Sequence, residues 1–164
     1  MSYHFQPMTP DHAHAIVQWR YPGEYAFYNM DEDPDDLREF LDNKAWEPDT
    51  KFSVTDNSGT LVGFFEFIRH EDMIEIGLGL RPDMTGNGHG ESFVRAGLAF
   101  AVKRFNPRRL RVAVATFNKR AITVYERVEF STTKTFMRAT NRDLFEFVEM
   151  EREIATGKGT SNAG

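Results

Sequence analysis

Cysteine is absent from the 164 residues of this chain. Disulfide bonds, thiolate metal sites and a cysteine nucleophile are therefore excluded. No apolar run is long enough to cross a bilayer and no signal peptide is visible, so we expect a cytoplasmic protein without a membrane partner. The chain also lacks a net positive charge, because its 25 Asp and Glu residues outnumber its 20 Lys and Arg residues and give a formal net charge of -5 at pH 7. General binding to nucleic acid, which needs a basic surface, is not expected.

The two common nucleotide-binding motifs are missing as well. The chain contains neither G-x-x-x-x-G-K-[ST] nor G-x-G-x-x-G. It has instead three alternating glycines, Gly86, Gly88 and Gly90, in the stretch 85–90. The sequence therefore gives no reason to expect NAD or a nucleoside triphosphate, but it does contain a glycine-rich turn that needs an explanation.

This glycine run lies between a strand-like segment, residues 73–80, and a helix-like segment, residues 91–105. Glycines let the backbone turn tightly and come close to a ligand. The start of a helix offers free N–H groups and the positive end of the helix dipole. The arrangement suits a phosphate or a pyrophosphate. The alternative is a plain structural turn, in which the glycines serve geometry alone.

A second motif follows about 30 residues later. Residues 110–116 have the pattern of a strand, and Ala121, Val124, Tyr125 and Val128 then recur at helical spacing. Asn118 precedes this helix and is a plausible N-cap. The pattern predicts a strand followed by a short amphipathic helix over residues 119–128.

Taken in this order, the two motifs resemble those of the GNAT N-acetyltransferase superfamily, over about residues 50–150. The resemblance implies acetyl-CoA as cosubstrate, with its pyrophosphate on the glycine run and its pantetheine arm near the second motif. The cofactor contacts that it implies are Leu78, Leu80, Thr85, Gly86, Asn87, Gly88, His89, Gly90, Asn118, Ala121 and Tyr125. Two positions depart from the family pattern: Thr85 replaces the usual Arg or Gln, and Glu129 replaces the usual Gly.

The expected fold is a single α/β domain over residues 1–154, with a mixed, mostly antiparallel sheet flanked by helices. We expect the sheet to be splayed between strands 73–80 and 110–116, where the resemblance places the cofactor. The other strands are predicted at 3–7, 51–56, 60–69, 131–137 and 144–150, and the other helices at 10–19, 34–46 and 91–105. Residues 155–164 are small and polar, and we predict that they are disordered.

Amine acetylation needs a group that protonates the departing thiolate and a base that deprotonates the amine. The match to the family assigns the first role to Tyr125, whose alternative role is packing in the core. Glu75 is a candidate base, because it shares one face of its strand with Gly77 and Gly79. That face would let the cofactor lie close to the backbone.

Glu66 is a second candidate base. If the hairpin between its strand and the next is centred on His70 and Glu71, Glu66 lies directly opposite Glu75. Two adjacent carboxylates raise one pKa toward neutrality, whereas in the alternative each is a solvated strand residue. Because Ala113 stands where some family members have a glutamate, deprotonation through water is a third possibility. His89 has no second ligand at useful spacing, so no metal is predicted.

The acceptor is expected to meet the N-terminal region, at Tyr25, Tyr28 and Glu66. Aromatic rings and carboxylates together suit a cationic amine, whether a small molecule or the amine of a peptide. An aromatic core beside an acidic helix start is the alternative.

The predicted reaction is direct acetyl transfer in a ternary complex. A CoA-binding sensor without catalysis and a scaffold without any cofactor are the rival hypotheses. A homodimer is possible, because the exposed edge strands of such sheets often pair.

Overall fold

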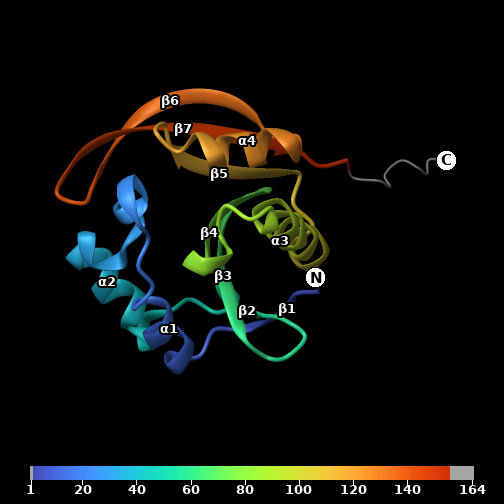
Figure 1. The fold of residues 1–164 in the computed structure, drawn as a ribbon. Coiled ribbons are helices and arrows are strands. Elements are labelled where there is room, and N and C mark those ends of the chain that lie inside the picture. The colour runs from blue at the N-terminus through green and yellow to red at the C-terminus, as the bar shows by residue number, and fades with distance from the viewer. Residues whose placement is uncertain (1, 156–164) are drawn as a thin grey trace.

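The computed structural model describes residues 2–155 (Figure 1). The order of elements is β1 (His4–Pro7), α1 (Pro10–Ile16), η1 (Gly23–Tyr28), η2 (Met30–Glu32), α2 (Pro34–Leu41), η3 (Asn43–Ala45), β2 (Lys51–Thr55), β3 (Leu61–His70), β4 (Met73–Leu80), η4 (Pro82–Met84), α3 (His89–Phe105), β5 (Arg109–Ala115), α4 (Lys119–Arg127), β6 (Ser131–Thr140) and β7 (Asp143–Glu153). Each η element is a short 3-10 helix. Disorder is predicted for residues 155–164, but residues 156–164 lie outside the described part of the chain.

The strands form a seven-stranded sheet in the order β1-β2-β3-β4-β5-β7-β6. All neighbouring strands are antiparallel except β4 and β5, which run parallel. The parallel ladder joins only residues 73–75 to residues 109–111, and its last pair is Glu75 with Arg111. The remainder of β4 and of β5 have no ladder between them in the described chain.

The helices cover both faces of the sheet. On one face α3 packs against β3, where the rings of Phe93 and Phe65 lie 4.7 Å apart. Gly97 makes this approach possible, because a Cβ added to it would lie 2.1 Å from the Phe65 ring. On the other face α1 and α2 bury a smaller cluster that includes Ile16, Phe40 and Phe64. In Figure 1, β1–β4 lie below, and β5, β6 and β7 lie with α4 at the top.

Several elements end elsewhere than predicted, for local reasons. The helix expected to reach Trp19 ends at Ile16, and the N–H groups of Gln18 and Trp19 bond to carbonyls three residues back instead of four. The second helix ends at Leu41, since Asp42 has a ψ of 75°. The last two strands are longer than predicted because a two-residue turn with positive φ joins them, at Asn141 (50°) and Arg142 (68°).

Candidate functional site

The glycine loop has the backbone geometry that its sequence predicts at two of its three glycines. Gly86 and Gly88 have φ of 76° and 81°, in the left-handed region that favours glycine. Gly88 is the N-cap of α3 and has no side chain to cap the first turn. Gly90 lies inside the helix, where a Cβ would make only an ordinary contact with Val124 at 3.9 Å. The loop thus leaves the helix start open to an anion.

Arg120 lies beside this loop, and sequence reasoning missed it. One of its terminal nitrogens is 3.0 Å from the point where a Cβ of Gly86 would stand. Its guanidinium also lies 4.3 Å from the centre of the Tyr25 ring. The available signal was the uncharged Thr85, whose hydroxyl donates to the Pro82 carbonyl at 2.7 Å. A loop without a cation of its own indicates that a positive charge comes from another element of the fold.

Asn118 occupies the predicted N-cap of α4. Its Oδ1 accepts a hydrogen bond from the Ala121 N–H at 3.1 Å, and its Nδ2 donates to the Tyr28 hydroxyl at 2.9 Å. The structure therefore brings together a predicted cofactor residue and a predicted acceptor residue that are 90 positions apart in the sequence.

Tyr125 lies two turns into α4, with only 7% of its surface exposed. Its ring packs on Phe130, at 5.7 Å between centroids. The pKa of Tyr125 is raised above its ordinary value, mainly by burial and secondly by the neighbouring Tyr28. A phenol in such surroundings keeps its proton well into the alkaline range and is protonated at neutral pH.

The segment η1 brings Tyr25 and Tyr28, two of the three predicted acceptor residues, to the end of β5, while the third, Glu66, lies on β3. Phe27 packs edge-on against Phe117 at 5.3 Å and against Phe145 at 4.9 Å. Tyr25 and Tyr28 lie 6.1 and 5.9 Å from the same Phe117 ring. Aromatic packing therefore holds this short 3-10 helix next to Asn118.

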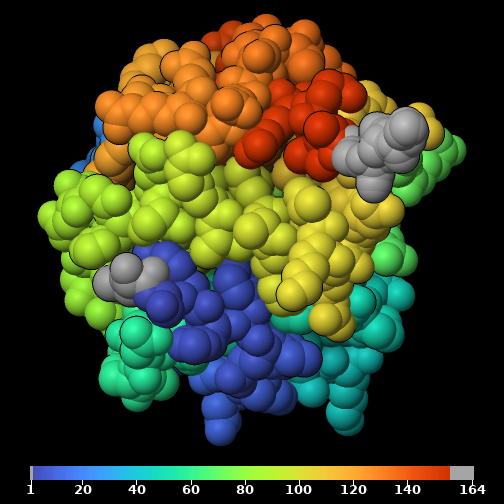
Figure 2. Space-filling view, turned by 90° about the vertical axis from the view of Figure 1, so that its right-hand side faces the viewer, coloured from blue at the N-terminus to red at the C-terminus, as the bar shows by residue number. Residues whose placement is uncertain are grey.

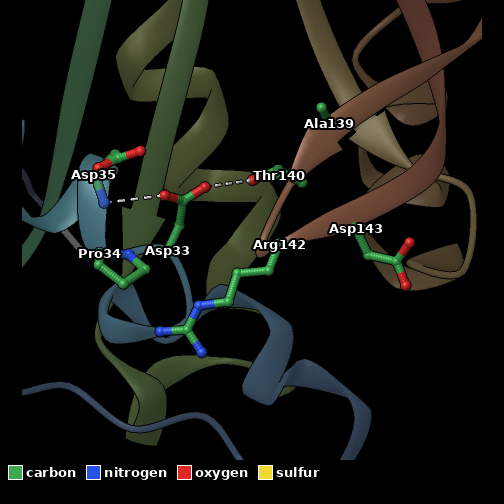
Figure 3. Close-up of a pocket in the computed structure, with 7 residues that line it drawn as sticks. All are labelled: Asp33, Pro34, Asp35, Ala139, Thr140, Arg142 and Asp143. Atoms are coloured by element: carbon green, nitrogen blue, oxygen red, sulfur yellow. Dashed lines mark hydrogen bonds between the residues drawn. The ribbon is translucent and has the colours of Figure 1, made fainter.

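A hydrogen-bonded clasp fixes the other end of this region (Figure 3). Asp33 caps α2 by accepting from two N–H groups of its first turn, at 3.1 and 3.2 Å. Its second oxygen accepts from the Asn141 N–H at 3.1 Å and from the Thr140 hydroxyl at 3.3 Å. The Asn141 side chain in turn donates to the Phe27 carbonyl at 2.8 Å. The tip of the β6–β7 hairpin is thus tied to both α2 and η1.

The expectation that Glu66 and Glu75 face each other directly is wrong. The hairpin turns at Glu71 and Asp72, which pairs Glu66 with Gly77 and leaves Glu75 opposite Ile68. The two glutamates share a face of the sheet but are diagonal neighbours. The sequence placed the turn one residue too early, because Glu71 takes a φ of 54° that usually marks a glycine or asparagine.

Each glutamate has its own partner. The Lys51 ammonium donates to Glu66 at 2.9 Å, across the β2–β3 ladder. Glu75 lies 3.1 Å from the His70 ring nitrogen, and a quarter of its side chain is exposed. Glu66 is therefore held in an ion pair, while Glu75 is bound to a weaker, titratable neighbour.

The two glycines of β4 differ in what they accommodate. A Cβ on Gly79 would lie 2.3 Å from the Phe64 ring, so packing accounts for this glycine. Gly77 is exposed, and a Cβ there would meet nothing closer than Glu66 at 3.8 Å. Leu80 is buried and Leu78 half-buried, on the face toward α3. The predicted close approach to the backbone therefore applies to Gly77 alone.

Negative charge gathers near Glu66. The pKa of Asp36 is raised above its ordinary value. Burial is the largest cause, and the charges of Asp33, Glu39, Asp35 and Glu66 follow. Glu66 is paired with Lys51 and Asp35 with Arg38, so the negative local potential comes chiefly from Asp33, Asp36 and Glu39. This part of the surface favours a cation.

Figure 2 shows the outer face of α3, between the blue N-terminal strand and the orange-red C-terminal strands. A hollow of about 410 Å³ on this face is lined by Arg95, Leu98, Ala99, Val102, Lys103 and Arg152. None of these residues belongs to the glycine loop, η1 or α4. The hollow is therefore separate from the candidate site.

The chain is similar to known proteins in both sequence pattern and fold. A family model described as acetyltransferase (GNAT) domain matches residues 4–131. The crystal structure of spermidine N-acetyltransferase from Vibrio cholerae in complex with CoA and spermine is similar, with a TM-score of 0.72 and 18% identity, covering 92% of this chain and 95% of that one. An acetyltransferase of the GNAT family from Bacillus anthracis has a TM-score of 0.71 and 16% identity, covering 93% and 95%.

These structures share the fold of the present chain and confirm the predicted mixed sheet flanked by helices. No curated protein sequence matches the chain. Within residues 2–155, no helix is long and apolar enough to span a membrane. The same residues contain no group of three or more His, Asp or Glu side chains placed to hold a metal ion.

Proposed function

The chain belongs to the GNAT acetyltransferase family and is therefore an acyltransferase, and on that premise we propose that it moves the acetyl group of acetyl-CoA to a primary amine in a ternary complex. The observation that carries this proposal is the meeting of the two predicted motifs. The open helix start at Gly88 and the Asn118–Tyr125 helix lie on neighbouring elements, since α3 packs on α4. A covalent acyl-cysteine is excluded, because the chain has no cysteine.

The pyrophosphate of acetyl-CoA would bind at residues 85–90, on the N–H groups of the loop and of the first turn of α3. Arg120 would supply the positive charge that Thr85 lacks. The pantetheine arm would enter between β4 and β5 beyond the pair Glu75–Arg111, where the ladder ends. Backbone groups of β4 left without a partner on that side can then pair with the amides of the arm.

In the proposed reaction the amine attacks the thioester carbonyl carbon and the C–S bond breaks. Tyr125 protonates the departing sulfur, and its raised pKa ensures that it carries a proton at neutral pH. Glu75 is the proposed base, acting directly or through a water molecule. Glu66 is less suited to that role, because Lys51 already neutralises it.

The acceptor would lie against Tyr25, Tyr28 and the acidic surface around Glu66. An ammonium group is favoured there by the negative potential and by the aromatic rings. The solved Vibrio cholerae relative holds spermine, a polyamine. We therefore propose a cationic amine, with spermine as the first compound to test, while a peptide amine remains the alternative class.

The test is release of CoA thiol from acetyl-CoA in the presence of an amine. Because the protein has no cysteine, a thiol reagent detects only the CoA product. Release that depends on both the protein and an amine is expected. Binding of acetyl-CoA without turnover of any amine in a broad panel would contradict the proposal. A cytoplasmic location and a homodimer stay predictions from the sequence.

A further inference from the structure

Tyr28 has a hydroxyl hydrogen that the protein leaves free. The Oδ1 of Asn118 is occupied by the N–H of Ala121, which turns the Nδ2 of the same amide toward Tyr28. An amide NH₂ group can only donate, so the Tyr28 oxygen accepts this hydrogen bond. Within residues 2–155, no acceptor lies within hydrogen-bonding distance for the hydrogen of Tyr28 itself. That hydrogen is available to a bound molecule.

The position of Tyr28 is fixed at the ring and open at the hydroxyl. Its ring packs edge-on against Phe27 at 5.1 Å and lies 5.9 Å from Phe117. At the same time 37% of the residue is exposed. Tyr28 is also close enough to Tyr125 for its charge to affect that residue's titration. Two phenols, one buried on α4 and one accessible at the N-cap of that helix, are therefore near enough to interact electrostatically.

We infer that Tyr28 is a second hydrogen-bond and proton donor to the departing thiolate, acting beside Tyr125. This inference rests on the proposed function. The C–N bond forms as the C–S bond breaks, and the electron pair of the broken bond goes to sulfur. A phenolic O–H then transfers its proton to sulfur, which gives the CoA thiol and a tyrosinate. The proton lost by the amine nitrogen restores the tyrosine through solvent, so the step is balanced.

The arrangement does not make Tyr28 compete with the cofactor for Asn118. The amide NH₂ has two hydrogens, and Tyr28 uses one of them. The second remains for a carbonyl of the pantetheine arm, which the family match places near Asn118. One capping residue thus orients the helix, the accessible phenol and the cofactor arm together.

The direct test is Tyr28→Phe, with Tyr3→Phe, whose hydroxyl meets Ser92 outside the site, as its control. Both variants keep the ring and lose a hydroxyl, but only Tyr28 is hydrogen-bonded to Asn118. With acetyl-CoA and spermine, or the best amine of the panel, Tyr28→Phe should lower kcat by about tenfold or more, as expected for a proton donor. Its KM for acetyl-CoA and its affinity for CoA should not change, and Tyr3→Phe should keep a kcat close to that of the parent protein.

A second variant separates proton donation from packing. Asn118→Asp keeps an acceptor for the Ala121 N–H, so α4 stays capped. The new carboxylate can only accept, so the Tyr28 hydroxyl would donate its hydrogen to it. We expect kcat to fall at least as far as in Tyr28→Phe, and the KM for acetyl-CoA to rise, because the carboxylate also lacks the amide hydrogen offered to the pantetheine arm. The double variant should show no further loss of kcat relative to Asn118→Asp, because the free hydrogen of Tyr28 is already removed in that variant.

A kcat of Tyr28→Phe equal to that of the parent protein would overturn the inference and leave the proposed function intact. Additive losses in the double variant would also overturn it, since they indicate independent structural effects. A parent protein that turns over no amine at all would instead overturn the proposed function, and the inference with it.

Discussion

The cofactor side and the acceptor side of the candidate site are built in opposite ways. The cofactor side is local: the stretch 85–90 turns and starts α3 within a few residues. The acceptor side is assembled from distant segments, as the hydrogen bond between Tyr28 and Asn118 illustrates. The comparison indicates that the proposed anion site is formed by a contiguous stretch of sequence, whereas the proposed surroundings of the amine depend on tertiary packing.

This difference explains what could be predicted. The glycines at 86 and 88 and the cap at Asn118 follow from local rules, because positive φ and helix capping leave strong residue preferences. The contact of Arg120 with the glycine loop and the clasp at Asp33 have no such local signal. The prediction that Glu66 pairs with Glu75 failed because moving the turn by one residue changes which strand residues lie opposite each other.

The strongest way to break the site from its interior is Tyr125→Phe. The change removes the proposed acid and keeps the buried ring, so kcat should fall by about 100-fold while CoA still binds. Steady-state kinetics and calorimetry measure the two effects. Tyr3→Phe, on the exposed β1 side, is the control and should leave kcat unchanged. A Tyr125→Phe protein with full kcat would remove this residue from the mechanism.

The two candidate bases, Glu66 and Glu75, lie on the same face of the sheet and can be compared directly. Glu75→Gln should lower kcat/KM by about tenfold, less than is usual for a base because water can partly replace it. Glu66→Gln should have a smaller effect on kcat, because Lys51 already pairs with that carboxylate. Rates measured from pH 6 to 9 test the assignment. The reverse order of effects would make Glu66 the base.

Arg120→Ala tests whether the cofactor side borrows a cation from α4. Loss of the guanidinium should raise the KM for acetyl-CoA by about fivefold, in line with about 1 kcal/mol for an exposed charge contact. Lys119→Ala is the control, since it removes a charge from the same helix start. The increase should shrink at high salt. Equal effects of the two variants would argue against a specific role of Arg120.

The clasp can be weakened by Asn141→Ala, which removes the bond to the Phe27 carbonyl. Asn106→Ala is matched to it, because Asn106 has a φ of 51° and Asn141 has 50°. Both lose the same backbone preference, so the difference between them measures the clasp. We expect Asn141→Ala to be less stable than the control by about 1 kcal/mol in urea unfolding. It should also raise the KM for the amine but not for acetyl-CoA.

The smallest expected effect concerns stability at alkaline pH. Burial raises the pKa of Tyr125 and of Tyr21 above the ordinary value of 10.0. Well below pH 10 both tyrosines are protonated in the folded and in the unfolded state, so the free energy of unfolding does not depend on them there. As the pH rises above 10, the unfolded state loses these protons first, so the free energy of unfolding falls. The fall should be shallower in Tyr125→Phe, and an identical slope would show that this phenol ionises normally.

Binding of acetyl-CoA at the glycine loop is the central claim, and calorimetric titration tests it most directly. Acetyl-CoA and CoA should bind the parent protein with a Kd in the range of about 1 μM to 1 mM, whereas NAD should not bind. Gly88→Val, which forces a branched side chain into a φ of 81°, should weaken binding strongly. Gly59→Val, which has a matching φ of 84° in the turn before β3 and lies outside the site, should bind as the parent does. A folded parent protein that binds neither acetyl-CoA nor CoA would contradict the account.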